Sequence, residues 1–166
     1  SAASNSSRPL LAARLLAANV IDAELLDEAV ADARQRRIPL VRHLLDLQLI
    51  PPARLADITA ETFGMKRGQD ESLDSENALV RQFEPALIRH HRALPLQYEG
   101  DTLQVAISDP ANVKALDALR LHAGCPVEPL LVADDVLTQR LNALVTVKPE
   151  TDDSVEIQDE GESTRN

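Results

Sequence analysis

The first third of the chain repeats one hydrophobic pattern. The apolar positions of the first copy recur in the second at an offset of 29 residues: Leu15, Leu16, Ile21 and Leu26 correspond to Leu44, Leu45, Ile50 and Leu55. Each copy predicts a short helix, a tight corner and a longer helix. Asp22 and Pro51-Pro52 are suited to begin the longer helices, and Gly64 is suited to end the second. Residues 9–65 are therefore expected to form a small helical subdomain of two helix-turn-helix repeats.

A polar linker is predicted over residues 66–76, where Gly68 and several carboxylates interrupt the apolar pattern. The linker has no apolar stripe that could fix the two units against each other. Contact between the units must therefore use apolar surface that the four helices do not bury among themselves. We expect that surface to be small. The helical subdomain should then adopt more than one orientation, or open at little cost in free energy.

Residues 77–145 predict an α/β subdomain of β-β-α-β-α order. It is expected to start with a helical run through Leu79, Phe83, Leu87 and Ile88, followed by a hairpin of strands over 93–98 and 102–107. A helix then begins at Asp109-Pro110, with the apolar stripe Val113, Leu116, Leu119 and Leu121. A third strand over 127–132 and a last helix through Val136, Leu137, Leu141 and Leu144 complete the subdomain. The crossover makes the third strand parallel to the second. The predicted fold class is α+β: a small N-terminal helical bundle, then a sandwich-like β-β-α-β-α unit.

Charge is unevenly distributed, and the formal net charge of the chain is −10. Residues 146–166 hold seven acidic side chains against Lys148 and Arg165, with few aliphatic residues, which predicts a disordered, flexible acidic tail. Residues 1–8 are small and polar and predict a disordered end. The acidic balance and the scarcity of aromatic residues argue against nucleic acid as a partner.

The sequence lacks the residues that several kinds of function require. Cys125 is the only cysteine, and apolar runs are too short for membrane insertion. The glycines form neither a phosphate-binding loop nor a dinucleotide-binding turn, so we expect no catalysis, cofactor or metal in this chain. His90-His91 are adjacent on a helix and point apart, and Asp134-Asp135 are interpreted as a helix start.

One basic cluster is a candidate partner-binding site. Arg34, Arg36 and Arg37 are the densest group of positive charges in an acidic chain. Two interpretations stay open: the arginines are a solvated helix end, or they form a docking patch for an acidic partner.

Three segments of the second subdomain carry a family resemblance: Arg-Ala-Leu-Pro-Leu at 92–96, Leu-Gln-Val-Ala-Ile-Ser-Asp-Pro-Ala-Asn at 103–112, and Ala-Leu-Asp-Ala-Leu at 115–119. Residues 85–144 resemble the N-terminal domain of the type II secretion traffic ATPases (general secretory pathway protein E) and of their type IV pilus assembly relatives. Residues 10–64 resemble the helical subdomain that precedes it in this family.

The resemblance implies a role in protein export. It implies that the acidic tail leads to a hexameric ATPase core, outside this chain, which would bind ATP and Mg. It further implies that the domain attaches this core to the cytoplasmic domain of an inner-membrane secretion component, the L-type protein. The expected location is cytoplasmic, and peripheral at the inner membrane through that partner.

Cyclic di-GMP sensing is the alternative function that the resemblance implies. Some members of the wider family bind this ligand through two copies of a motif close to R-L-G-x-x-L-V-x-x-G-x-I. At the R, L, first G and second G places this chain has Leu10, Leu11, Ala12 and Asn19 in the first copy, and Pro39, Leu40, Val41 and Gln48 in the second. Both arginines and all four glycines are replaced, so we expect the ligand site to be lost while the scaffold is kept.

Overall fold

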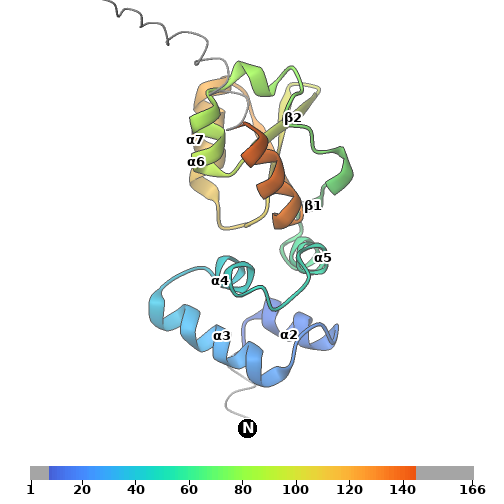
Figure 1. Cartoon of the computed structure of the whole chain (residues 1–166), viewed down its shortest axis with the longest axis vertical. Coiled ribbons are helices and arrows are strands. Elements are labelled where there is room, and N and C mark those ends of the chain that lie inside the picture. Colours follow the sequence, from blue (N-terminus) through green and yellow to red (C-terminus); the bar gives the residue numbers. More distant parts are fainter. Residues whose placement is uncertain (1–7, 145–166) are drawn as a thin grey trace, which may run out of the picture.

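The computed structural model describes residues 8–144, and these form an α+β fold (Figure 1). A bundle of helices comes first, and a four-stranded mixed sheet with its own helices follows. The predicted fold class is confirmed. The acidic tail predicted over residues 146–166 lies outside the described residues.

The helical unit has the order that the repeat predicts. Its helices are α2 (Leu10–Ala17), α3 (Ala23–Arg36), α4 (Leu40–Leu47) and α5 (Pro52–Phe63). The equivalent residues Leu15 and Leu44 are both fully buried in its core. The two corners are also equivalent, because Asn19 and Gln48 both have left-handed backbone, with φ of 57° and 56°.

The ends of the helical unit are fixed by local interactions. Pro52 opens α5, and Gly64 closes it at a φ of 65°, as predicted. The interpretation of residues 1–8 as a disordered end is wrong for Arg8. Its guanidinium donates two hydrogen bonds of 2.8 Å to the carboxylate of Asp27 and so ties the start of the described chain to α3.

The sheet has the strand order β1-β4-β3-β2. Its strands are β1 (Lys66–Arg67), β2 (Leu94–Glu99), β3 (Thr102–Ile107) and β4 (Val127–Leu131). β2 and β3 form the predicted antiparallel hairpin, with Gly100 in the turn at a φ of 64°. β4 runs parallel to β3, as the crossover rule predicts.

Strand β1 corrects the interpretation of residues 66–76 as a linker. Lys66 and Arg67 pair in parallel with Leu130 and Leu131 of β4, and the Gly68 amide donates to the Leu131 carbonyl. A Cβ atom on Gly68 would lie 2.8 Å from a methyl carbon of Val132, so glycine is needed for this close approach. Polar residues can form an edge strand because only one of its sides must pair.

The helical run predicted from Leu79 to Ile88 is wrong, because the chain is broken there. Residues Val80–Gln82 form the short 3-10 helix η2, Phe83 is extended, and α6 covers Pro85–His91. Proline disfavours helical backbone in the residue before it and lacks the amide that a continuous helix would use. Pro85 therefore starts a helix instead of lying inside one.

Helix α7 (Val113–Ala123) begins later than predicted, with Asn112 at its N-cap, so the expected start at Asp109-Pro110 is wrong. The predicted stripe also needs correction. Leu119 is fully buried, whereas Val113 and Leu121 are 56% and 85% exposed. Leu121 lies only two positions after Leu119, about 200° around the helix, so the two side chains cannot share one face.

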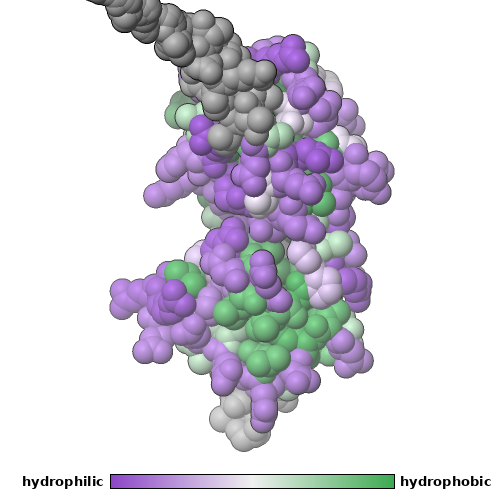
Figure 2. Space-filling model, in the orientation of Figure 1, coloured by the Kyte–Doolittle hydropathy of each residue, from purple (hydrophilic) through white to green (hydrophobic). Residues whose placement is uncertain are grey.

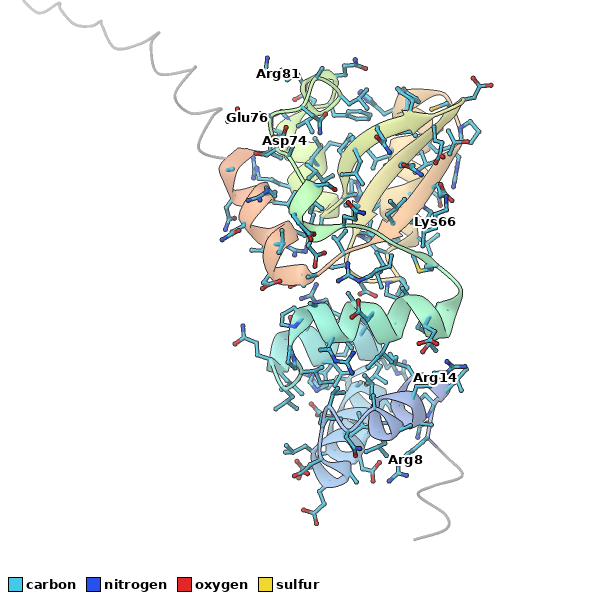
Figure 3. All side chains as sticks on the ribbon, turned by 90° about the vertical axis from the view of Figure 1, so that its right-hand side faces the viewer. Arg8, Arg14, Lys66, Asp74, Glu76 and Arg81 are labelled. Carbon is cyan, nitrogen blue, oxygen red and sulfur yellow. The ribbon has the colours of Figure 1, made fainter. Side chains whose placement is uncertain are left out.

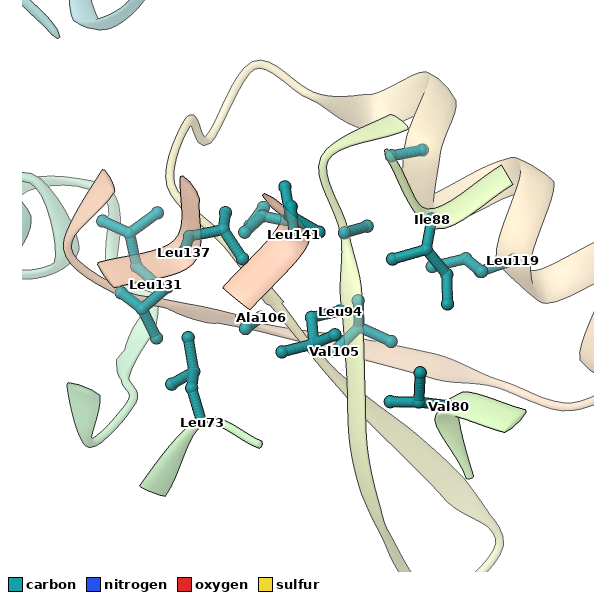
Figure 4. Packing of buried hydrophobic residues seen from close by; sticks show 14 of the residues in the cluster. Leu73, Val80, Ile88, Leu94, Val105, Ala106, Leu119, Leu131, Leu137 and Leu141 are labelled. Atoms are coloured by element: carbon teal, nitrogen blue, oxygen red, sulfur yellow. The ribbon is translucent and has the colours of Figure 1, made fainter. Parts of the chain in front are cut away.

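The α/β core lies between the sheet and its helices (Figure 4). Leu119 of α7, Ile88 of α6 and Leu137 of the last described helix, residues 134–144, are fully buried in one cluster with Val105 of β3. Leu73, which follows the 3-10 helix η1 (Asp70–Ser72), also joins this core.

Helix α5 belongs to both units and corrects the expectation of a small contact between them. It lies across the molecule between the other helices and the α/β unit (Figure 3). Leu55 and Ile58 are buried in the helical core, whereas Ala56 and Ala60 are buried in the α/β core. A helix with two apolar faces holds two units together, because each face packs into a separate core.

Candidate functional site

An arginine-centred network holds α5 against the sheet. Arg67 donates to Asp57 of α5 at 2.8 Å and to both carboxylate oxygens of Asp70 at 2.9 and 3.0 Å. It also donates to the carbonyls of Gly68 and Leu131. The hydrogen bond from Arg67, with one from the Ala133 amide, lowers the pKa of Asp70 below its ordinary value despite partial burial. The sequence pattern does not predict this network, because it indicates a polar linker at Arg67.

The predicted partner-binding arginines lie together at the C-terminal end of α3. Arg34, Arg36 and Arg37 are all exposed. Arg36 forms an ion pair with Asp32 one turn earlier, at 3.4 Å, and Arg37 ends the helix with a φ of 58°. Positive charge at a helix C-terminus is favourable with or without a partner, so this geometry is compatible with both interpretations of the cluster.

The two motif copies meet at an apolar groove of about 410 Å³ between the units. Leu10 and Leu11 of the first copy and Pro39 and Leu40 of the second line it, together with Phe63 of α5. None of these side chains has a hydrogen-bond donor, so they cannot bind a phosphate as arginine does. Both motif arginine positions are thus occupied by groove-lining apolar residues.

A carboxylate also lines this groove. Asp109 follows β3, and its Oδ1 accepts a hydrogen bond of 2.9 Å from the Ala111 amide. Burial raises the pKa of Asp109 above its ordinary value. An ionised Asp109 would repel an anionic ligand, which adds to the loss of the two arginines.

The backbone conformation explains why the family motif has a glycine at its second glycine position. Asn19 and Gln48 occupy the second glycine position of each copy, and both have positive φ. Glycine adopts this conformation without strain, and asparagine tolerates it better than most residues. The fold therefore retains the turn that the glycine makes but adds an exposed side chain in each copy.

Asp134 lies at the centre of a second polar network that the sequence did not predict. Its Oδ1 accepts hydrogen bonds from Ser108 Oγ at 2.6 Å and from Arg92 at 2.8 Å. Arg42 of α4 lies 3.9 Å from its Oδ2 and links the helical unit to the α/β unit. Asp134 and Asp135 begin the last described helix, as predicted.

The histidines and carboxylates do not assemble a metal site in the part of the chain that the structure describes. Within residues 8–144, no group of three or more histidine, cysteine, aspartate or glutamate side chains is arranged to hold a metal ion. His43 lies 2.8 Å from the carboxylate of Asp32 and connects α4 to α3. In that same range, no helix is both long and apolar enough to cross a membrane.

The comparisons place this fold in one family. A model of the MshEN domain matches residues 63–149. The type IV pilus assembly ATPase PilB of Pseudomonas aeruginosa is 35% identical over 134 residues, which are 81% of this chain and 24% of that protein. PilB of Acinetobacter baylyi is 30% identical over 129 residues, which are 78% of this chain and 22% of that protein.

Two solved structures share the fold. A structure of MshE with cyclic di-GMP has a TM-score of 0.61 at 21% identity, and covers 82% of this chain and 99% of that one. A structure of the N-terminal domain of XpsE has a TM-score of 0.62 at 18% identity, and covers 82% of this chain and 96% of that one. The chain belongs to the MshEN domain family. It is similar to part of the type IV pilus assembly ATPases, which the resemblance named as relatives, and it spans about a quarter of the length of these curated relatives.

Proposed function

We propose that this chain is a non-catalytic docking and regulatory domain of a type II protein secretion ATPase. It attaches the ATPase to the cytoplasmic domain of the inner-membrane L-type protein, so that ATP hydrolysis drives a pseudopilus and exports protein. ATP and Mg bind to the ATPase core and not to this domain, which lies at the cytoplasmic face of the inner membrane. Membership of the MshEN family is the observation that carries this proposal.

The same role in a type IV pilus assembly ATPase is the second candidate. The 35% identity with PilB of Pseudomonas aeruginosa favours it, because this identity extends over 81% of the chain. Both candidates share one mechanism: the domain recognises a protein at the membrane, and the connected core hydrolyses ATP. Binding assays against the cytoplasmic domains of both machineries distinguish them.

The basic cluster gives the first test of docking. Replacing Arg34, Arg36 and Arg37 with glutamate should weaken binding to the cytoplasmic domain of the L-type protein by about tenfold or more at low salt, and high salt should reduce this difference from the unmodified chain. The matched control reverses three exposed positive charges in the α/β unit: Arg81, Lys114 and Arg120. Equal affinities of the two triple variants at low and high salt would show that the cluster is a solvated helix end.

Cyclic di-GMP sensing is supported by the structural similarity to MshE with cyclic di-GMP. The groove residues oppose it. A lost hydrogen bond to a charged group costs about 1.5–3 kcal/mol, so two absent arginines should weaken binding by a factor of about 100 or more. Calorimetric titration of the chain should therefore detect no binding at micromolar ligand.

A reverse experiment serves as the control for this prediction. Leu10→Arg and Pro39→Arg, combined with Asn19→Gly and Gln48→Gly, restore both arginines and the two turn glycines. This variant should gain measurable affinity for the ligand if the motif alignment is correct. Micromolar binding by the unmodified chain would instead show that the alignment of the two copies is wrong.

A further inference from the structure

A second groove lies between the α4–α5 corner and the start of the last described helix. It has a volume of about 710 Å³ and is named the corner groove here. Leu45, Leu49, Ile50 and Pro51 form its apolar side, and Asp134 and Asp135 form its acidic side. Both structural units therefore contribute to it.

The apolar side continues a hydrophobic surface of the helical unit. Figure 2 shows apolar side chains gathered on this face of the helical unit, directly beneath the α/β unit. Leu45 and Leu49 pack on the helical core yet are only half-buried, and Pro51 is exposed. A contiguous apolar surface of this kind is typical of a protein-binding site.

The acidic side offers one carboxylate whose charge is available. The carboxylate of Asp134 already forms an ion pair with the Arg92 guanidinium at 2.8 Å, and the Arg42 guanidinium lies 3.9 Å from it. Asp135 is exposed, and its Oδ1 accepts a hydrogen bond of 2.9 Å from the Val136 amide. Among residues 8–144, Asp135 forms no ion pair within 4.0 Å, so its charge can meet a positive side chain of a partner.

Charge disfavours two other occupants. A second copy of the chain would bring another net charge of −10 to an acidic rim. Residues 146–166 carry seven acidic side chains against two basic ones and would be repelled in the same way. An occupant that is both apolar and basic is complementary to the two sides of the groove.

We infer that the corner groove docks an amphipathic segment of the membrane partner, with apolar side chains on Leu45 and Leu49 and a lysine or arginine at Asp135. This inference rests on the proposed docking function for the identity of the partner. Because the groove is built from both units, an occupant contacts both of them and adds to the junction that α5 already makes. Binding at the membrane should thereby stabilise the junction between the helical unit and the α/β unit.

The groove's preference is tested with synthetic probes on the full chain. The probe is an amphipathic helical peptide with leucines on one face and lysines at its edge. Two matched peptides replace every lysine with glutamine or with glutamate. Fluorescence anisotropy should give the tightest binding for the lysine peptide, weaker binding for the glutamine peptide, and the weakest for the glutamate peptide.

Matched variants locate the binding. Asp135→Lys should weaken binding of the lysine peptide by about threefold to tenfold, whereas Asp101→Lys at the tip of the β2–β3 hairpin should not. Leu49→Ser should weaken it by about tenfold, whereas Leu47→Ser should not. Leu47 lies on α4, is 42% exposed and does not line the groove. Because it is only two positions from Leu49, it controls for the loss of a neighbouring leucine outside the groove.

Three results of the peptide experiments would overturn the inference. They are absence of binding by the lysine peptide, equal binding by Asp135→Lys and Asp101→Lys, and tightest binding by the glutamate peptide. Self-association that Leu49→Ser abolishes would also overturn it, since a second copy would then fill the groove. Failure of the proposed function is seen separately, as no binding of the unmodified chain to the L-type cytoplasmic domain.

Discussion

Replacing Leu44 with alanine should lower the free energy of unfolding of the helical unit by about 2–5 kcal/mol. Leu44 is 0% exposed and lies in the core of the helical unit. Truncation leaves a cavity that the neighbouring helices cannot fill without moving. Because a small unit is only marginally stable, a loss of this size should unfold it selectively.

Urea unfolding followed by circular dichroism measures the change, and amide signals from each unit show which part unfolds. Leu47→Ala is the control, because Leu47 lies on the same helix and is 42% exposed. Its cost should stay below about 1 kcal/mol. Equal costs for both variants would mean that the helical unit does not depend on its own core.

The elements set by local patterns were predictable from the sequence. The repeat gave four helices because the spacing of its leucines is a local property of each helix. The β2–β3 hairpin was predictable for the same reason, since alternation and a glycine turn lie within adjacent residues. The order of the helical and α/β parts followed from the change of period between them.

The errors concern residues whose structure depends on distant partners. Lys66–Arg67 has no strand pattern of its own, and it becomes a strand only because β4 offers a free edge more than sixty residues later in the chain. The apolar role of Ala56 and Ala60 was missed because alanine fits a core, a surface and a helix junction equally well. Tertiary packing decided each of these assignments.

The candidate sites divide in the same way. The loss of the motif arginines was visible from the aligned residues, because it concerns residue identity alone. The two grooves were not visible, because each brings together segments that are remote in the sequence. The corner groove, for example, combines the α4–α5 corner with Asp134 and Asp135.

Replacing Arg67 with methionine should lower the free energy of unfolding by about 2–3 kcal/mol, a value reduced for the partial exposure of the guanidinium. The variant leaves Asp57 and Asp70 without their cation and two carbonyls without a donor. Hydrogen exchange should then accelerate at β1 and along α5, where the two units meet. Arg120→Met removes an exposed ion pair of 2.7 Å with Asp117 and should cost less than about 0.5 kcal/mol.

The pH dependence of stability identifies the cause of this effect. Since Arg67 holds the pKa of Asp70 below its ordinary value of 3.8, the stabilising interaction is complete above that value. The stabilising interaction is lost as the pH falls further, through the pKa of Asp70 in the folded state, because the carboxylate becomes protonated. The difference between the unmodified chain and Arg67→Met should therefore be constant near neutral pH and shrink in strong acid. A difference that persists unchanged in acid would mean that Arg67 stabilises the junction by packing its aliphatic stem, and not through the carboxylate of Asp70.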